Sequence, residues 1–117
     1  MSDDPLSLVF SALADPTRRA ILTRLARGEA TVAQLTEPFA ISQPAVSRHL
    51  KVLERAGLIV RDKTGRFRPS ALRVQGLDDA RDWIAHWRGV WDERFARLDA
   101  HLERIGATRT TTGKASR

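Results

Sequence analysis

Cysteine and tyrosine are absent from this 117-residue chain. A chain without cysteine can form no disulfide framework, no zinc–thiolate site and no thiol nucleophile. No apolar run approaches the roughly 20 residues that span a bilayer. The segment Ser2-Asp3-Asp4-Pro5 is acidic, whereas a secretory signal begins with a basic segment. We therefore expect a cytoplasmic protein without a membrane partner.

Recognisable catalytic patterns are also missing. The length gives about one domain with one modest core, which excludes a large multidomain enzyme. The sequence has no nucleophile with a base and an orienting acid, no glycine-rich phosphate loop and no carboxylate pair placed for catalysis. Asp78, Asp79 and Asp82 open the last predicted helix, where carboxylates favour the positive end of the helix dipole. We expect no catalytic residue, no cofactor and no enzymatic activity.

The net charge of +6 is concentrated in one part of the chain. Residues 42–68 carry seven basic and two acidic side chains, a net charge of +5. Residues 1–41 and 69–106 each sum to −1, and residues 107–117 add +3. A basic block in an otherwise balanced chain is typical of a polyanion partner, because clustered cations release counterions when they meet phosphates. A solvated surface is the alternative interpretation.

Four short helices are expected in the first half of the chain. Apolar residues recur at helical spacing from residue 6 to residue 14, and Pro16 begins a second helix that Gly28 ends. Thr31 caps a third helix of about two turns. Ser42 caps a fourth helix over residues 43–56, with Pro44 in its first turn.

A small hairpin and a long helix are expected in the second half. Strands at residues 58–62 and 67–74 flank the turn Lys63-Thr64-Gly65-Arg66, and Pro69 limits the second strand. A helix of about 29 residues, roughly 43 Å long, follows from Leu77 to Ile105. We expect a mainly α winged helix-turn-helix in which residues 1–106 form a DNA-binding and dimerisation domain. The Thr-rich, basic residues 107–117 should form a disordered tail.

The predicted helix 43–56 has two different faces. Its apolar stripe consists of Val46, Leu50 and Leu53, and its cations lie on the opposite side. Such a helix fits the major groove of DNA, about 12 Å wide, with its first residues nearest the base edges. Together with the hairpin it gives the candidate DNA contacts Ser42, Gln43, Pro44, Ser47, Arg48, Lys51, Arg55, Lys63, Arg66 and Arg68.

These residue types indicate different roles on a duplex. The Gln43 amide can pair with adenine and the Arg48 guanidinium with guanine, while the serines can bond bases or phosphates. Lys51, Arg55 and the hairpin cations are expected at phosphates or in a flanking minor groove. Alternatively, Ser42 is only a cap and Arg55 a solvated side chain. His49 borders the apolar stripe, so we expect it to be packed or backbone-bonded and not to read a base.

The motifs resemble a known family. The runs from Leu13 to Leu22 and from Ser42 to Ile59, followed by the Lys-Thr-Gly-Arg hairpin tip, are similar to the ArsR-type winged-helix bacterial transcription regulators. The resemblance covers about residues 5–106. It implies a homodimer, built from the first and last helices, that represses transcription by occupying an operator. It also implies autoregulation of a neighbouring operon.

The aromatic stripe of the last helix independently predicts a homodimer. A domain this small has little core against which to bury that stripe, and a two-fold axis would place two recognition helices about 34 Å apart over a pseudo-palindrome. Alternatively, the stripe packs on the first helix of a monomer. The candidate interface residues are Leu6, Val9, Phe10, Trp83, Trp87, Trp91, Phe95, Leu98 and Leu102.

Metal sensing in the resembled family uses cysteines in the third helix, or aspartate, histidines and glutamate on the last. This chain has no cysteine, and His86 and His101 lie about 22 Å apart along one helix, too far to share a metal. Only an antiparallel dimer could bring Asp82 and His86 of one chain toward His101 of the other. We expect no metal site.

Two other functions are left open by the sequence. One is a derepressor that responds to a metal or small ligand at the long-helix interface, where an aromatic pocket around Trp83, Trp87 and Trp91 could accept an apolar molecule. The effector, if one exists, is unknown. The other is an interaction module that uses the tryptophan stripe and binds no DNA. The predicted function is a sequence-specific, homodimeric repressor whose partner is double-stranded operator DNA.

Overall fold

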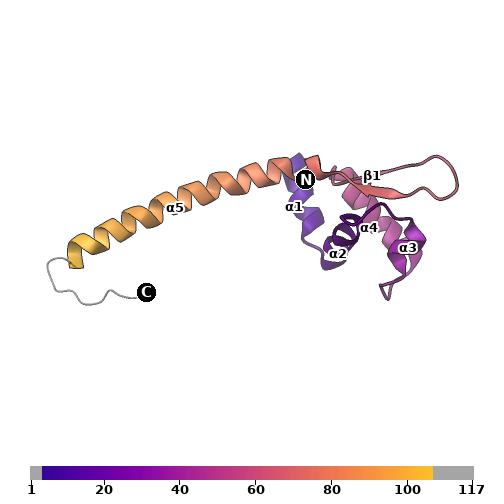
Figure 1. Ribbon diagram of the computed structural model, residues 1–117, viewed down its shortest axis with the longest axis horizontal. Coiled ribbons are helices and arrows are strands. Elements are labelled where there is room, and N and C mark those ends of the chain that lie inside the picture. Colours follow the sequence, from indigo (N-terminus) through magenta and orange to yellow (C-terminus); the bar gives the residue numbers. More distant parts are fainter. Residues whose placement is uncertain (1–3, 107–117) are drawn as a thin grey trace. The chain divides into compact units, whose positions relative to one another are not determined.

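The computed structural model describes residues 4–106 (Figure 1). It contains five α-helices, one 3-10 helix and one two-stranded sheet. In chain order the elements are α1 Pro5–Leu13, α2 Pro16–Leu25, α3 Val32–Thr36, α4 Gln43–Arg55, β1 Ile59–Arg61, β2 Ser70–Leu72, η1 Val74–Leu77 and α5 Asp78–Gly106. The chain divides into two compact units, one ending at Arg81 and the other beginning at Asp82.

The four predicted short helices are confirmed, with small differences at their ends. Side chains of Asp4, Asp15, Thr31 and Ser42 cap the first four helices by accepting hydrogen bonds from backbone amides. Helix α3 has five residues and is shorter than expected. It begins with a reciprocal capping box, in which Gln34 Oε1 accepts from the Thr31 amide at 2.9 Å.

The core of the first unit lies between α1, α2, α3, α4 and the hairpin. Its fully buried large side chains come from every one of these elements except α1, which contributes Val9 and Ala12. The three apolar residues predicted for the inner face of α4, Val46, Leu50 and Leu53, are all 0% exposed. Burial of this stripe fixes which face of α4 remains available to solvent.

The hairpin is shorter than the sequence predicted. The strands pair antiparallel, with Ile59 opposite Leu72 and Arg61 opposite Ser70. The second strand was expected from residue 67 but begins after Pro69, because proline has no amide to donate and Arg68 adopts a positive φ of 46°. The turn glycine, Gly65, has the expected positive φ of 76°. An unpredicted bridge between Ala30 and Ser70 attaches the hairpin to the helices.

Helix α5 agrees with the predicted long helix to within one residue at each end and has 29 residues. A short 3-10 turn, η1, precedes it. Asp78 and Asp79 occupy its first turn, as expected. No helix in the described part of the chain is both long enough and apolar enough to cross a membrane. The predicted tail, residues 107–117, lies outside the described residues.

Candidate nucleic-acid interface

The outward face of α4 carries the polar residues that the sequence singled out. Gln43 and Pro44 in the first turn are exposed, as are Arg48 and Lys51 farther along, while Ser47 is half-buried. Ser42 is exposed at the cap position, and its Oγ accepts from the Ala45 amide at 3.3 Å. The helix therefore combines one buried apolar face with an exposed face of hydrogen-bonding and cationic side chains.

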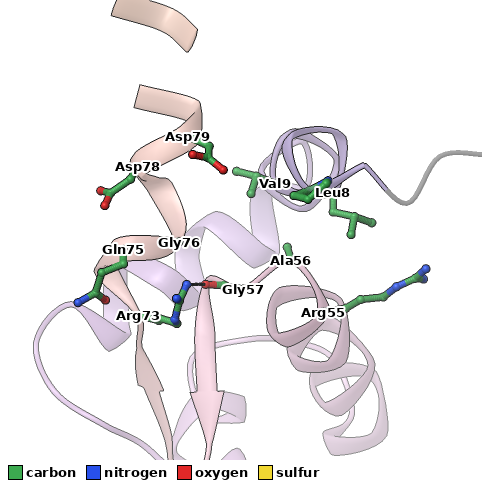
Figure 2. Close-up of a pocket in the computed structure, with 11 residues that line it drawn as sticks. Leu8, Val9, Arg55, Ala56, Gly57, Arg73, Gln75, Gly76, Asp78 and Asp79 are labelled. Atoms are coloured by element: carbon green, nitrogen blue, oxygen red, sulfur yellow. Dashed lines mark hydrogen bonds between the residues drawn. The ribbon is translucent and has the colours of Figure 1, made fainter. Parts of the chain in front are cut away.

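Arg55 lies at the other end of α4, about 18 Å from Gln43 along the helix axis. It lines a pocket of about 470 Å³ formed by α1, the end of α4, the chain between the hairpin and α5, and the first two residues of α5. In Figure 2 its side chain extends outward, whereas Arg73 turns inward and donates to the Gly57 carbonyl oxygen at 3.2 Å. Arg55 is thus well separated from the residues nearest the α4 N-terminus.

The hairpin is joined to α4 by an ion pair. Lys63 Nζ lies 3.1 Å from Glu54 Oε2, so one of the predicted wing cations is already paired with a carboxylate on α4. Next to it, the Asp62 carboxylate accepts from the hydroxyl and amide of Thr64, and these hydrogen bonds lower its pKa from the ordinary value of 3.8. Lys63 therefore contacts α4 in the single chain, although it lies in the loop of the hairpin.

The loop of the hairpin, which we call the wing tip, presents two arginines on either side of an aromatic residue. Arg66 and Arg68 are exposed, and Arg68 Nε donates to the Gly65 carbonyl oxygen at 3.2 Å. Between them, Phe67 is 75% exposed, the highest exposure among the exposed large apolar residues of the described chain. Phe67 was not among the predicted DNA contacts, although an aromatic residue between two arginines beside a turn glycine was a visible signal.

His49 is held by a side chain that was not predicted from the sequence. It is half-buried, as expected, and its Nδ1 lies 3.2 Å from Nη1 of Arg18 on α2. Its partner is therefore a side chain and not the backbone. Asp15 Oδ2 is 3.9 Å from the same Nδ1. The pKa of Asp15 is lowered from 3.8, first by the hydrogen bond from the Arg18 amide and also by the nearby positive charge of Arg18.

The predicted dimer residues fall into two groups. On α5 the aromatic and aliphatic stripe is about half-exposed, and its rings contact one another, with Trp91 and Phe95 stacked at a centroid distance of 5.3 Å. On α1, Phe10 is exposed and Leu6 is half-buried against the core. Val9, the third α1 residue predicted at the interface, is 3% exposed in the single chain, because its face of α1 packs into the core of the first unit.

Comparison with known proteins identifies the family. Residues 13–62, from the end of α1 to the hairpin, match a helix-turn-helix domain family. The chain is 38% identical over 79 residues to the transcriptional repressor SdpR of Bacillus subtilis, a match covering 68% of this chain and 88% of SdpR. A crystal structure of an ArsR family transcriptional regulator matches with a TM-score of 0.72 and 40% identity, covering 76% of this chain and 98% of that one. This chain belongs to the ArsR family of transcriptional regulators.

The other comparisons agree with this ArsR-family assignment. The homodimeric winged helix-turn-helix DNA-binding domain of a possible ArsR-family regulator from Mycobacterium bovis matches with a TM-score of 0.56 and 26% identity, covering 80% of this chain and 84% of that one. The predicted fold class is confirmed. Several other curated relatives are matched over about half of their own length.

The histidine and acidic side chains form no metal-binding cluster in the part of the chain that the structure describes. Among residues 4–106, no group of three or more histidine, cysteine, aspartate or glutamate side chains lies close enough to hold a metal ion. His86 instead contacts the ring of Trp87 edge-on, with a centroid distance of 5.6 Å.

Proposed function

We propose that this ArsR-family regulator is a homodimeric repressor that reads a pseudo-palindromic operator with the outward face of α4. The observation that carries the proposal is the division of α4 into a fully buried stripe and an exposed face with Gln43, Arg48 and Lys51. A helix held in this way can enter a major groove without disturbing the core.

Two side chains on that face are suited to reading bases. Gln43, in the first turn, presents an amide that pairs bidentately with adenine. Arg48 lies one and a half turns later and presents a guanidinium that matches the two acceptors of guanine. Pro44 and Ser47 lie between them, where they can contact a thymine methyl group or a base edge. Ser42 combines its capping bond with a position beside the phosphates.

The remaining cations are assigned to the DNA backbone. Lys51 faces the same way as Arg48 and is placed to meet phosphate, and Arg55 would meet phosphate only at the far end of α4. Arg66 and Arg68 are assigned to the neighbouring groove, with Phe67 against the sugars between them. We assign Lys63 a smaller contribution to phosphate binding, because reaching a phosphate would break its ion pair with Glu54.

The exposed stripe of α5 supports a dimer. Trp83, Trp87, Trp91, Phe95, Leu98 and Leu102 each remain 44–55% exposed in the single chain. Apolar area of this kind is typical of an interface, and two-fold association is the commonest way to cover it. In the homodimeric relative a winged helix-turn-helix domain pairs with a second copy. We extend this to our chain and assign the α5 stripe to the interface, together with Leu6 and Phe10 of α1.

A dimer of this kind would act where chromosomal DNA is accessible, which is the cytoplasm of a bacterial cell. Repression follows when the operator overlaps a promoter, and autoregulation follows when that promoter is its own. SdpR carries the name of a repressor. The proposal requires no cofactor and no catalytic step.

Selection of bound sequences from a random duplex pool tests this function. The full chain should enrich a two-fold symmetric site with half-sites one helical turn apart. Arg48→Ala should lose preference at one base pair in each half-site, at a cost of roughly 1–3 kcal/mol. Recovery of no common sequence, or equal losses of Arg48→Ala on the selected and on random duplexes, would refute base reading by α4.

A further inference from the structure

We propose that Arg18 is a positioning residue for DNA binding. Its guanidinium joins the last turn of α1 to α4 and thereby sets operator affinity, although Arg18 itself does not contact DNA. The inference rests on the proposed function and adds a residue that lies outside the DNA-facing surface.

The first two bonds of Arg18 are to α1. Its Nε donates to the Ala12 carbonyl oxygen at 2.9 Å, and its Nη2 donates to the Ser11 carbonyl oxygen at 3.1 Å. Carbonyls in the last turn of a helix lack intrahelical donors, and a cation there also interacts favourably with the negative end of the helix dipole. The guanidinium is therefore fixed to the end of α1.

The third bond is to α4. Arg18 Nη1 lies 3.2 Å from His49 Nδ1. A guanidinium can only donate, so His49 Nδ1 must be the acceptor, and the ring proton of a neutral His49 is then on Nε2. One planar group on α2 thus connects α1 with the helix that carries Gln43 and Arg48. Lysine could not reproduce this, because a single ammonium lacks the fixed fork of donors.

The Arg18–His49 bond is coupled to DNA binding through the neighbour of His49 in α4. His49 directly follows Arg48, so a rotation or shift of α4 that breaks the Arg18 bond also moves Arg48. Bidentate contacts lose energy when the side chain is displaced by more than about 0.5 Å from its productive geometry. A small loosening of α4 can therefore weaken base reading while the helix remains folded.

The main packing contacts of α4 do not involve this guanidinium. Val46, Leu50 and Leu53 attach α4 to the core and are fully buried, whereas the Arg18 bonds are only partly buried. The cap of α2 uses the Arg18 backbone amide, which donates to Asp15 Oδ2 at 3.0 Å and survives a change of side chain. Loss of the Arg18 side chain should therefore change the position of α4 more than it changes the stability of the domain.

Arg19 supplies a matched control. Its Nη1 donates to the Leu13 carbonyl oxygen at 2.7 Å, so it also caps the end of α1, from the next position on α2. No bond from Arg19 to α4 is among those of the described residues. The two arginines carry the same charge, and they differ in whether they reach α4.

The experiment measures binding of the full chain to the duplex recovered in the selection, at several salt concentrations, together with thermal melting of each variant. Arg18→Met should weaken binding about tenfold, the loss expected for one charge-assisted hydrogen bond, with the salt dependence unchanged. Arg19→Met should change affinity less than about twofold.

The His49 variants test the acceptor of the same bond. His49→Leu should show the same loss of affinity as Arg18→Met, and His49→Asn should keep the wild-type affinity, because the asparagine Oδ1 replaces the Nδ1 acceptor. The Arg18→Met/His49→Leu double variant should be no weaker than either single variant.

Three results would overturn the inference. One is an equal effect of Arg18→Met and Arg19→Met, and another is a shallower salt dependence for Arg18→Met, which would mean a direct phosphate contact. The third is a loss of affinity no larger than the loss of folded protein; should Arg18→Met fail to fold, the two His49 variants carry the same test. Wild-type protein that binds no selected duplex would instead refute the proposed function, and this inference with it.

Discussion

The backbone of Gly76 lies directly against the carbonyl group of Gly57, so that a Cβ at position 76 would overlap the Gly57 oxygen and lie 2.8 Å from its carbonyl carbon. Gly57 ends α4 with a positive φ of 77°, and Gly76 lies in the 3-10 turn before α5. The Arg73 side chain donates to the same Gly57 oxygen (Figure 2). This contact joins the segment between the hairpin and α5 to the end of α4.

Gly76→Ala should therefore destabilise the protein. The added methyl group meets backbone, which cannot move aside as a flexible side chain can, and overpacking of this kind costs about 1–3 kcal/mol. Each kcal/mol should lower Tm by roughly 4–8 °C in a domain of this size. Gly89→Ala is the control, because a Cβ there meets nothing within 4 Å and alanine favours a helix. Equal Tm values for Gly76→Ala and wild type would contradict the close contact.

Gln43 and Lys51 on α4 should contribute differently to the salt dependence of DNA affinity. Lys51→Ala should weaken binding to operator and random duplexes alike and lower the slope of log K against log salt by about 0.9. Gln43→Ala should weaken only operator binding, by roughly 1–3 kcal/mol, and leave that slope unchanged. Fluorescence anisotropy at several salt concentrations measures both. A Gln43→Ala variant that behaves like Lys51→Ala would assign Gln43 to the backbone.

Phe67 at the wing tip should contribute to binding through its apolar area. Phe67→Ala should cost roughly 1–3 kcal/mol of operator affinity, the value of burying such a ring, and should not alter the salt dependence. Phe67→Leu should retain most of the affinity. Val60→Ala is the control, because Val60 is 51% exposed in β1 and away from the tip. Unchanged affinity for Phe67→Ala would exclude the ring from the interface.

The sequence predicted the parts of the site that depend on local periodicity. The buried stripe of α4, its serine cap and its glycine end could all be located because each is set by neighbours within a few residues. The same periodicity predicts Val9 at an interface, whereas Val9 lies in the core of the first unit. Periodicity identifies an apolar face but does not say whether the chain's own core or a second chain covers it.

Two tryptophans of α5 should decide the oligomeric state. Replacing both Trp87 and Trp91 by alanine removes the two largest rings from the middle of the exposed stripe, and buried aromatic anchors dominate interface energies. The variant should sediment as a monomer and bind the operator very weakly. Glu93→Ala/Arg97→Ala is the control, since an exposed pair 4.0 Å apart on the same helix contributes little. A double tryptophan variant that stays dimeric would move the interface elsewhere.

Long-range contacts are what the sequence could not reveal. Arg18 and His49 are 31 residues apart, and Gly57 and Gly76 are 19 apart, so neither contact follows from helical or strand periodicity. The strand Ser70–Leu72 was overestimated for a related reason: the positive φ of Arg68 cannot be read from its residue type. Such features depend on how separate elements pack, and only the assembled fold supplies that information.

Asp15 should contribute to the pH dependence of stability below neutral pH. Its pKa is lowered in the folded chain, chiefly by the hydrogen bond from the Arg18 amide, so the folded state binds this proton less readily than the unfolded state. The stabilisation is fully present above the unfolded pKa of 3.8 and is lost as pH falls through the lower folded value. Denaturation with urea between pH 5 and pH 2 should therefore show a shallower loss of stability for Asp15→Asn, which keeps a capping oxygen but cannot titrate.

Asp62 should account for part of the pH dependence of stability that remains in Asp15→Asn, because the Thr64 hydroxyl and amide also lower the pKa of Asp62. Asp99→Asn, at an exposed position on α5, provides the comparison, and identical acid profiles for it and Asp15→Asn would show that the Arg18 amide bond does not stabilise the Asp15 carboxylate.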